Sequence, residues 1–282
     1  MFPRREIAQR ISAIENRERE AFEALAKAFS SRSLSSTVCF TGPGGVGKSS
    51  LLANFAPRLV KKGRLAWLAC DPSSPVTGGS LLGDRIRMSG KDLSESLFIR
   101  SLSTRGARAF SRAVRDIAIY LESLFDWVLV ETAGAGQTES EIAELSPVTV
   151  LVLQPETGDE VQWMKSGLRE RSDIFVVNKS DLPGAEEMRR SLIDLGARED
   201  RVILCSSKSS EGLELLENSI LAFRKEEGFR EKLRQLHYNL SFSLFRESSE
   251  IEDAKRYSKL KASWEKNPYQ SFLAKARGAR SA

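Results

Sequence analysis

Two short motifs in this chain have the residue types and spacing needed to hold a guanine nucleotide. Residues 42–49 read Gly-Pro-Gly-Gly-Val-Gly-Lys-Ser, which fits the phosphate-wrapping pattern Gly-x-x-x-x-Gly-Lys-Ser/Thr. Residues 178–181 read Asn-Lys-Ser-Asp, which fits Asn-Lys-x-Asp, a pattern suited to the edge of guanine. Each motif follows a run typical of a buried parallel strand. Together they favour a GTPase over other classes of nucleotide-binding protein.

The glycine-rich motif predicts a loop that cradles phosphates. Its glycines let successive N–H groups face inward, where a Cβ would block a phosphate. A helix expected over residues 48–62 adds the partial positive charge of its N-terminus. We expect Lys48 to reach the β- and γ-phosphates and the Ser49 hydroxyl to bind Mg²⁺. The predicted phosphate-binding residues are Gly42, Pro43, Gly44, Gly45, Val46, Gly47, Lys48, Ser49 and Ser50.

The second motif predicts how the base is chosen. The Asp181 carboxylate can accept from guanine N1–H and N2–H₂ together, and adenine offers neither donor in that place. We expect Asn178 to contact N7 and brace the loops, while the stem of Lys179 covers one face of the base. A further loop is expected to place a backbone N–H against guanine O6, and it consists of Ser206, Ser207 and Lys208.

Acidic residues between the two motifs are placed to approach Mg²⁺. Asp71 follows a predicted strand and opens a loop rich in Gly, Pro and Ser that runs to Asp84. Glu131 follows the next strand and is expected to hold Mg²⁺ through water, with the Gly134 N–H touching the γ-phosphate. Helix or turn capping is the alternative role for Asp71 and Asp84. The predicted catalytic residues are Lys48, Asp71, Glu131 and Gly134, and the predicted metal ligands are Ser49, Asp71, Asp84 and Glu131.

Two positions narrow the class of GTPase. Ala135 stands where many signalling GTPases carry the glutamine that orients the attacking water, which predicts slow hydrolysis without a partner. Pro43 stands where the ATPases of the partition and arsenite-pump type have an additional lysine. The sequence therefore disfavours that group of ATPases.

Several segments between residues 37 and 220 resemble the methylmalonyl-CoA mutase-associated GTPases of the MeaB/ArgK type, also labelled LAO/AO transport system kinases. The resemblance rests on residues 71–88, which begin Asp-Pro-Ser-Ser-Pro, on 131–137, on 158–167 and on 178–181. It implies a homodimeric chaperone that uses GTP to gate the loading of adenosylcobalamin into a cobalamin-dependent acyl-CoA mutase, such as methylmalonyl-CoA mutase, and to protect that enzyme. Ala133 and Ala135 replace valines of the family pattern, and this removes no proposed ligand.

Two alternative functions stay open. A metal-delivery GTPase for another metalloenzyme is expected to carry a Cys/His cluster, whereas the chain has three scattered cysteines and one histidine. A transport-system kinase or ATPase follows from the older family label. Asp181 and the absence of a second catalytic domain weigh against that second alternative.

The alternation of strands and helices predicts an α/β fold. We expect a P-loop NTPase with a mostly parallel sheet flanked by helices on both faces, and the nucleotide at the carboxyl ends of the strands. The expected division is an N-terminal helical arm at 1–30, a linker at 31–36, the GTPase domain at 37–220 and a C-terminal helical extension at 221–282. A helix over 5–29 is expected to pack its apolar stripe either on this domain or on a partner.

The net positive charge of the chain comes from its last segment. Residues 221–282 hold 14 Lys/Arg and 8 Asp/Glu, while the whole chain carries a net charge of +5. Because the acids and helical apolar positions are interspersed, we expect a solvated helical arm rather than a nucleic-acid or membrane surface. Cys39, Cys70 and Cys205 fall in predicted strands, so buried free thiols in a reducing cytoplasm are expected. No signal peptide or membrane-length apolar run is visible.

Overall fold

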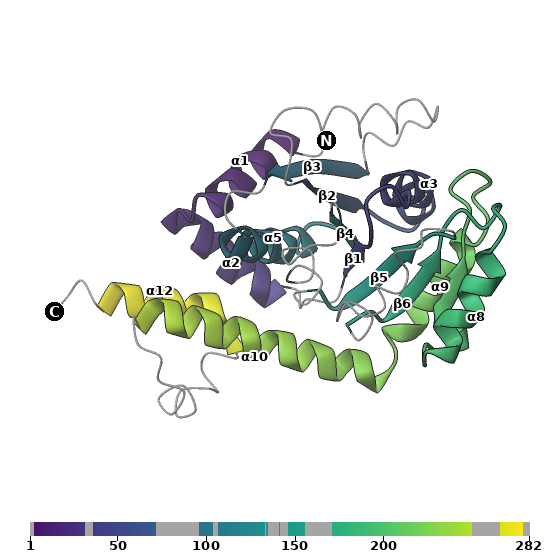
Figure 1. Cartoon of the computed structure of the whole chain (residues 1–282). Coiled ribbons are helices and arrows are strands. Elements are labelled where there is room, and N and C mark those ends of the chain that lie inside the picture. The colour runs from purple at the N-terminus through teal and green to yellow at the C-terminus, as the bar shows by residue number, and fades with distance from the viewer. Residues whose placement is uncertain are drawn as a thin grey trace.

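Seven parallel strands form one sheet whose carboxyl ends share an edge (Figure 1). The computed structural model describes residues 3–31, 36–71, 96–103, 107–132, 134, 141, 146–155, 171–249 and 266–278. The strand order is β3-β2-β4-β1-β5-β6-β7, and every strand pair is parallel. The strands are β1 (Thr37–Thr41), β2 (Leu65–Asp71), β3 (Leu97–Ser103), β4 (Trp127–Thr132), β5 (Val148–Leu153), β6 (Ile174–Val177) and β7 (Val202–Leu204).

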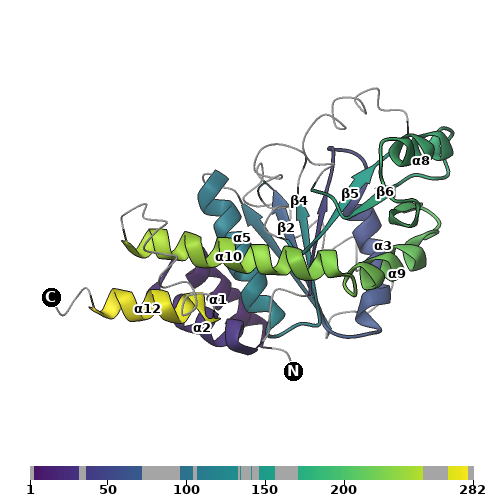
Figure 2. The same ribbon diagram turned by 90° about the horizontal axis from the view of Figure 1, so that it is seen from below.

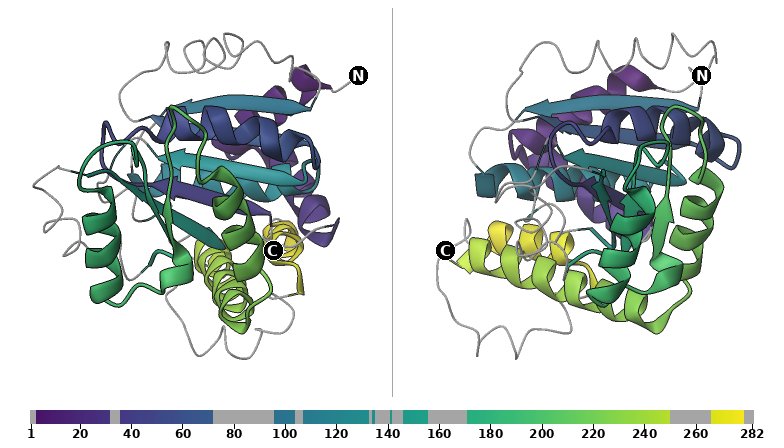
Figure 3. Two further views of the ribbon diagram at one scale, coloured as in Figure 1. Left: turned by 90° about the vertical axis from the view of Figure 1, so that its right-hand side faces the viewer. Right: turned by 45° about the vertical axis from the view of Figure 1, so that its right-hand side comes forward.

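Helices cover both faces of this sheet, as a parallel sheet requires (Figures 1 and 3). Alternate residues of β1 show the two faces, because Val38 and Phe40 pack under α3 and α9 while Cys39 packs under α1, α2 and α5. A smaller cluster lies under α8. The helices are α1 (Arg4–Glu15), α2 (Arg19–Ser31), α3 (Lys48–Val60), α5 (Ala107–Glu122), α8 (Ala185–Asp194), α9 (Leu213–Phe223), α10 (Glu227–Ser249) and α12 (Pro268–Gly278), with a 3₁₀ turn at Glu199–Arg201.

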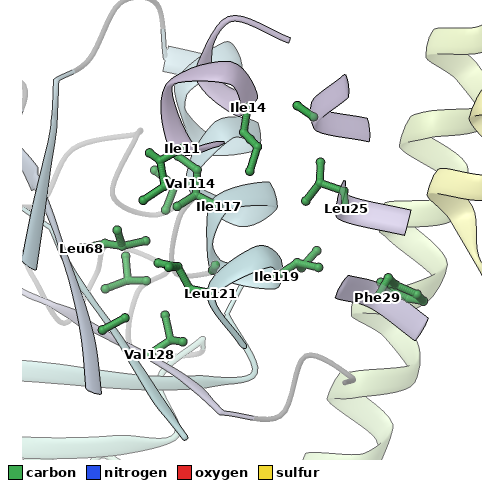
Figure 4. Close-up of a cluster of buried hydrophobic side chains, with 14 of the residues drawn as sticks. Ile11, Ile14, Leu25, Phe29, Leu68, Val114, Ile117, Ile119, Leu121 and Val128 are labelled. Atoms are coloured by element: carbon green, nitrogen blue, oxygen red, sulfur yellow. The ribbon is translucent and has the colours of Figure 1, made fainter. Parts of the chain in front are cut away.

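The N-terminal segment is two helices rather than the single helix expected over 5–29. The chain turns between α1 and α2, where Arg17 has a φ of 57° and the Glu18 N–H donates to the Ala13 carbonyl at 2.9 Å. Figure 4 shows Ile11 and Ile14 of α1 beside side chains of α5 in a shared core. Of the two packing modes expected from the sequence, the apolar stripe therefore takes the one on its own chain.

The C-terminal helices also pack on the body of the protein, so the expectation of a solvated arm is wrong for their apolar face. Leu236, Leu240 and Leu244 of α10 are buried in the core that α2 and α5 share. In every view α12 lies beside α10, and α12 also packs against α2 (Figures 1 and 2). Tyr269 of α12 is fully buried, and its hydroxyl donates to Asp116 of α5 at 2.7 Å. The helical spacing of the apolar residues in this segment therefore reflects the packing of α10 and α12 against the rest of the protein.

A polar residue fixes the start of α12. The Asn267 side chain accepts from the Gln270 N–H at 3.1 Å, which caps the helix, and Pro268 takes the first helical position. The Asn267 amide also donates to the Ala26 carbonyl at 2.8 Å and to the Ser30 hydroxyl at 2.7 Å. Asn267-Pro268 is therefore a helix start that is anchored to α2.

Candidate nucleotide-binding site

The glycine-rich loop joins β1 to α3 and passes close to two other segments. Gly42 has a φ of +142°, and a Cβ there would lie 2.1 Å from the Val152 carbonyl oxygen of β5. Gly47 has a φ of +87°, and a Cβ there would lie 2.6 Å from the Asn178 side chain. Both positions therefore need glycine. A Cβ added at Gly44 or Gly45 would meet no described atom within 4 Å, which leaves the space that a phosphate cradle requires.

Lys48 places a cation on this loop. It is the first residue of α3 and is 6% exposed. Its ammonium group donates to the carbonyls of Gly42 at 2.8 Å and Pro43 at 2.7 Å. The positive charge is thus held over the loop by backbone oxygens, next to the N-terminal end of the α3 dipole. Ser50 is the third residue of α3 and is exposed.

Ser49 and Glu131 converge from different elements. Ser49 lies in the first turn of α3 and Glu131 near the carboxyl end of β4, and the hydroxyl donates to Glu131 Oε1 at 2.5 Å. The Trp67 indole N–H of β2 donates to Glu131 Oε2 at 3.1 Å. A hydroxyl and a carboxylate are hard oxygen ligands of the kind that Mg²⁺ prefers. The residues present therefore fit the predicted metal.

The remaining predicted phosphate and metal residues are described only in part. Asp71 ends β2 and pairs with Ser103 of β3. The Gly134 carbonyl accepts from Thr132 Oγ1 at 3.2 Å. Asp84, like the segments 72–95 and 158–167, lies outside the described residues, as do Ala133 and Ala135. The roles predicted for Asp71, Asp84 and the Gly134 N–H therefore stay predictions.

Asn178 ties the two motifs together. Its side chain is fully buried, and its amide donates to the Val46 carbonyl of the glycine-rich loop at 2.8 Å. Its oxygen accepts from the Ser207 N–H at 3.2 Å and the Ser207 hydroxyl at 2.8 Å. Lys179, which has a φ of 59°, donates to the Gly45 carbonyl at 3.1 Å. The phosphate loop and the two predicted base loops thus form one connected structure.

Asp181 is held by the neighbouring loop. The buried Ser206 hydroxyl donates to Asp181 Oδ1 at 2.7 Å, and this hydrogen bond lowers the pKa of the exposed Asp181 carboxyl. Ser206 Oγ in turn accepts from the N–H of Lys208 at 3.3 Å and of Ser209 at 3.4 Å. An oriented, ionised carboxylate is an acceptor for two adjacent donors, as on the edge of guanine.

Sequence reasoning missed three contacts of this site. The Trp67 indole donates to Glu131, and the Asn54 side-chain amide of α3 donates to the Ser207 carbonyl. The hydroxyls of Thr41 and Thr132 pair at 3.1 Å across β1 and β4. None of these side chains belongs to a motif, and the signal that could have found Trp67 is its size, because a large aromatic donor in a buried strand needs an acceptor.

Among the residues that the structure describes, no group of three or more His, Cys, Asp or Glu side chains is arranged to hold a metal ion. No helix in the same part of the chain has the length and apolar character to span a bilayer. Cys39, Cys70 and Cys205 are buried free thiols, as predicted, and burial raises the pKa of Cys39 and of Cys205 to about 12.

Several known proteins from bacteria, archaea and mouse are similar to this chain in sequence. GTPase ArgK of Escherichia coli is 33% identical over 226 residues, which cover 75% of this chain and 68% of that protein. The mouse methylmalonic aciduria type A homolog, mitochondrial, is 34% identical over 203 residues, which cover 67% and 49%. A relative from Pyrococcus abyssi is 42% identical over 186 residues, which cover 65% of this chain. The chain spans 57% of that archaeal relative and 59% of one from Pyrococcus horikoshii.

Solved structures and a family model complete the comparison. A crystal structure of an LAO/AO transport system kinase aligns over the whole of both chains with a TM-score of 0.55 and 20% identity. The hydrogenase maturation factor HypB from Archaeoglobus fulgidus aligns over 78% of this chain and 99% of its own, with a TM-score of 0.54 and 17% identity. At these identities the likeness shows the P-loop NTPase fold alone. The model of the methylmalonyl Co-A mutase-associated GTPase MeaB matches residues 7–248, and the chain therefore belongs to the MeaB family of GTPases.

Proposed function

We propose that this chain binds GTP with Mg²⁺, hydrolyses it to GDP and phosphate, and thereby gates the loading of adenosylcobalamin into a cobalamin-dependent acyl-CoA mutase. The observation that carries the guanine specificity is the bond from the Ser206 hydroxyl to Asp181 Oδ1 at 2.7 Å. It orients the carboxylate and keeps it ionised, so that it can accept from N1–H and N2–H₂ of guanine. ATP offers no matching donors, which favours a GTPase over a transport ATPase.

The phosphates would lie in the glycine-rich loop. Backbone N–H groups of the loop and the N-terminus of α3 favour negative charge, and the Lys48 ammonium is already held there by the carbonyls of Gly42 and Pro43. The proposed role of Lys48 is to stabilise the charge that develops on the transferred phosphoryl group. Because such stabilisation is preorganised, it acts mainly on the rate of hydrolysis.

The metal would be held by Ser49 and Glu131, with Asp71 and Asp84 as further proposed ligands. When bound, Mg²⁺ neutralises charge on the β- and γ-phosphate oxygens. Glu131 is 7% exposed, and its two oxygens are held by Ser49 and by the Trp67 indole. The protein thus supplies a rigid, partly desolvated carboxylate at the mouth of the phosphate loop.

The proposed partner is a cobalamin-dependent acyl-CoA mutase, and we propose that the chain works as a homodimer. The family name associates these GTPases with methylmalonyl-CoA mutase. The mouse relative takes its name from methylmalonic aciduria. Adenosylcobalamin would be encountered only through the partner enzyme. A partner would also explain the sequence at Ala135, because the group that orients water must come from elsewhere.

Single-turnover hydrolysis of GTP tests this proposal. We expect slow hydrolysis by the isolated chain at saturating Mg²⁺, and an increase of about tenfold or more when purified methylmalonyl-CoA mutase of the same cell is added, since trans-acting groups in GTPases supply even larger factors. The matched control adds the mutase to the Asp181→Asn variant, which should show no stimulation at the same GTP concentration. Fast hydrolysis that no cobalamin mutase of the cell alters would contradict the chaperone role and leave an unassisted GTPase.

A further inference from the structure

A buried tryptophan lies directly beneath the metal side of the site. Trp67 of β2 is fully buried in the core that α3 covers. An indole N–H removed from water needs an acceptor, because an unpaired buried donor destabilises the folded protein. Its acceptor is Glu131 Oε2, at 3.1 Å. The side chain of this buried tryptophan thus ends on a carboxylate that we assign to Mg²⁺.

The sheet register explains how the indole reaches Glu131. In the pairing of β2 with β4, Trp67 lies opposite Leu129 and Ala69 lies opposite Glu131. Since alternate residues of a strand share a face, all four residues lie on the face beneath α3. Ala69 has only a methyl group, which leaves room for the indole to extend diagonally from position 67 to Glu131. A larger residue at position 69 would occupy that path.

Glu131 receives a different donor on each oxygen. The Ser49 hydroxyl donates to Oε1 at 2.5 Å and the Trp67 indole donates to Oε2. Ser49 is itself a proposed metal ligand on the phosphate loop, whereas the indole is part of the rigid core. The indole bond therefore fixes the rotation of the carboxyl group and keeps Oε1 on the side of Ser49.

We propose that Trp67 is a positioning residue of the Mg²⁺ site, which acts by holding Glu131 Oε2 through its indole N–H. The inference rests on the proposed GTPase function and adds a specific dependence to it. Groups that orient a metal ligand typically contribute a factor of 10–100 to metal affinity. Removing the Trp67 N–H should therefore shift the Mg²⁺ dependence of nucleotide binding, in that more Mg²⁺ is needed. The contacts to the base and the phosphates should stay intact.

The chain offers a matched control in the same sheet. Trp127 of β4 is also buried, but its ring stacks under the Arg224 guanidinium at 4.4 Å, near the amino end of the strands. Trp127→Phe and Trp67→Phe remove the same atoms from neighbouring strands. Only Trp67→Phe removes a hydrogen-bond donor to Glu131.

The test is calorimetric binding of a non-hydrolysable imido analogue of GTP to the full chain over a range of Mg²⁺ concentrations. We expect Trp67→Phe to raise the Mg²⁺ concentration for half-maximal binding by about 10–100-fold, with analogue affinity in EDTA unchanged. Trp127→Phe should leave both quantities unchanged. In case Trp67→Phe folds poorly, benzothienylalanine inserted at position 67 keeps the fused ring and replaces the N–H by sulfur, and we expect the same shift.

Each other outcome contradicts the inference in its own way. An unchanged Mg²⁺ dependence in the benzothienylalanine protein would show that the N–H is irrelevant. An equal shift in both tryptophan variants would show a general loosening of the sheet. Binding of the analogue by the unmodified chain that is indifferent to Mg²⁺ would instead overturn the proposed metal site itself, and this result is read without any variant.

Discussion

The two ends of the same sheet each bury a carboxylate, yet they differ in what holds it. At the carboxyl edge, Glu131 accepts from the Ser49 hydroxyl and the Trp67 indole, beside a glycine loop with open space. Near the amino edge, Glu122 Oε1 accepts from the N–H groups of Ser36 and Thr37 at 3.0 and 2.9 Å and from the Thr37 hydroxyl at 2.7 Å. The first carboxylate borders the proposed nucleotide site, and the second ties the end of α5 to the start of β1.

The difference shows that burial of an acid does not by itself identify a functional site. Glu122 is 1% exposed and Glu131 is 7% exposed, so exposure hardly separates them. The two carboxyl groups differ instead in their hydrogen-bond donors. Two donors to Glu122 are backbone N–H groups, which are fixed in place by the chain. Arg224 adds a further bond beside them by donating to the Ser36 carbonyl at 3.0 Å. A side-chain hydroxyl such as that of Ser49 can turn toward a ligand.

The largest expected effect comes from the loop cation. Lys48→Ala should lower the rate of GTP hydrolysis by about 10²–10³-fold. The substitution removes the preorganised positive charge that stabilises the negative charge developing on the phosphoryl group. Lys61→Ala, at the other end of α3, is the matched control and should hydrolyse GTP normally. Single-turnover rates at saturating GTP and Mg²⁺ measure the effect. Normal hydrolysis by the Lys48→Ala variant would show that the phosphates do not bind next to Lys48.

The base contact comes next in size. Asp181→Asn should weaken GTP binding by about 100-fold, because an amide cannot accept from both guanine donors. The same variant should gain affinity for xanthosine triphosphate, whose C2 carbonyl accepts from the new amide. Asp194→Asn, on the exposed face of α8, is the control. Competition binding that shows no gain for xanthosine triphosphate would argue that Asp181 does not read the base edge.

The smallest effect on nucleotide binding should come from the amino edge, where the consequence is stability. Burial raises the pKa of Glu122 from 4.5 to about 7. The native state then binds a proton more tightly than the unfolded chain, so the free energy of unfolding falls as pH rises from about 4.5 to about 7, by on the order of 3 kcal/mol. Glu122→Gln should lack this part of the pH dependence and keep normal GTP affinity.

Urea unfolding of both proteins at several pH values between these limits measures the Glu122 effect. Parallel stability curves for the two proteins would refute the assignment. A loss of GTP affinity in a well-folded Glu122→Gln protein would break the distinction between the two edges, since it would make the amino edge part of the nucleotide site.

The sequence predicted those parts of the site that are local in the chain. Residues 37–49 gave a strand, a loop and a helix start because their propensities and glycine positions act over neighbouring residues. The link from Trp67 to Glu131 spans 64 positions and depends on strand register, which no local pattern specifies. For the same reason, the apolar stripe of α10 predicted a helix but not the surface that it covers.

Guanine specificity is the central claim, and competition binding to the unmodified chain tests it most directly. A fluorescent GDP analogue is bound in the presence of Mg²⁺ and displaced by GTP or by ATP. With Asp181 held in place by Ser206, we predict that GTP displaces the analogue at concentrations about 100-fold or more below those of ATP. Equal displacement by the two nucleotides would contradict the account, because the carboxyl edge would then bind phosphates without reading the base.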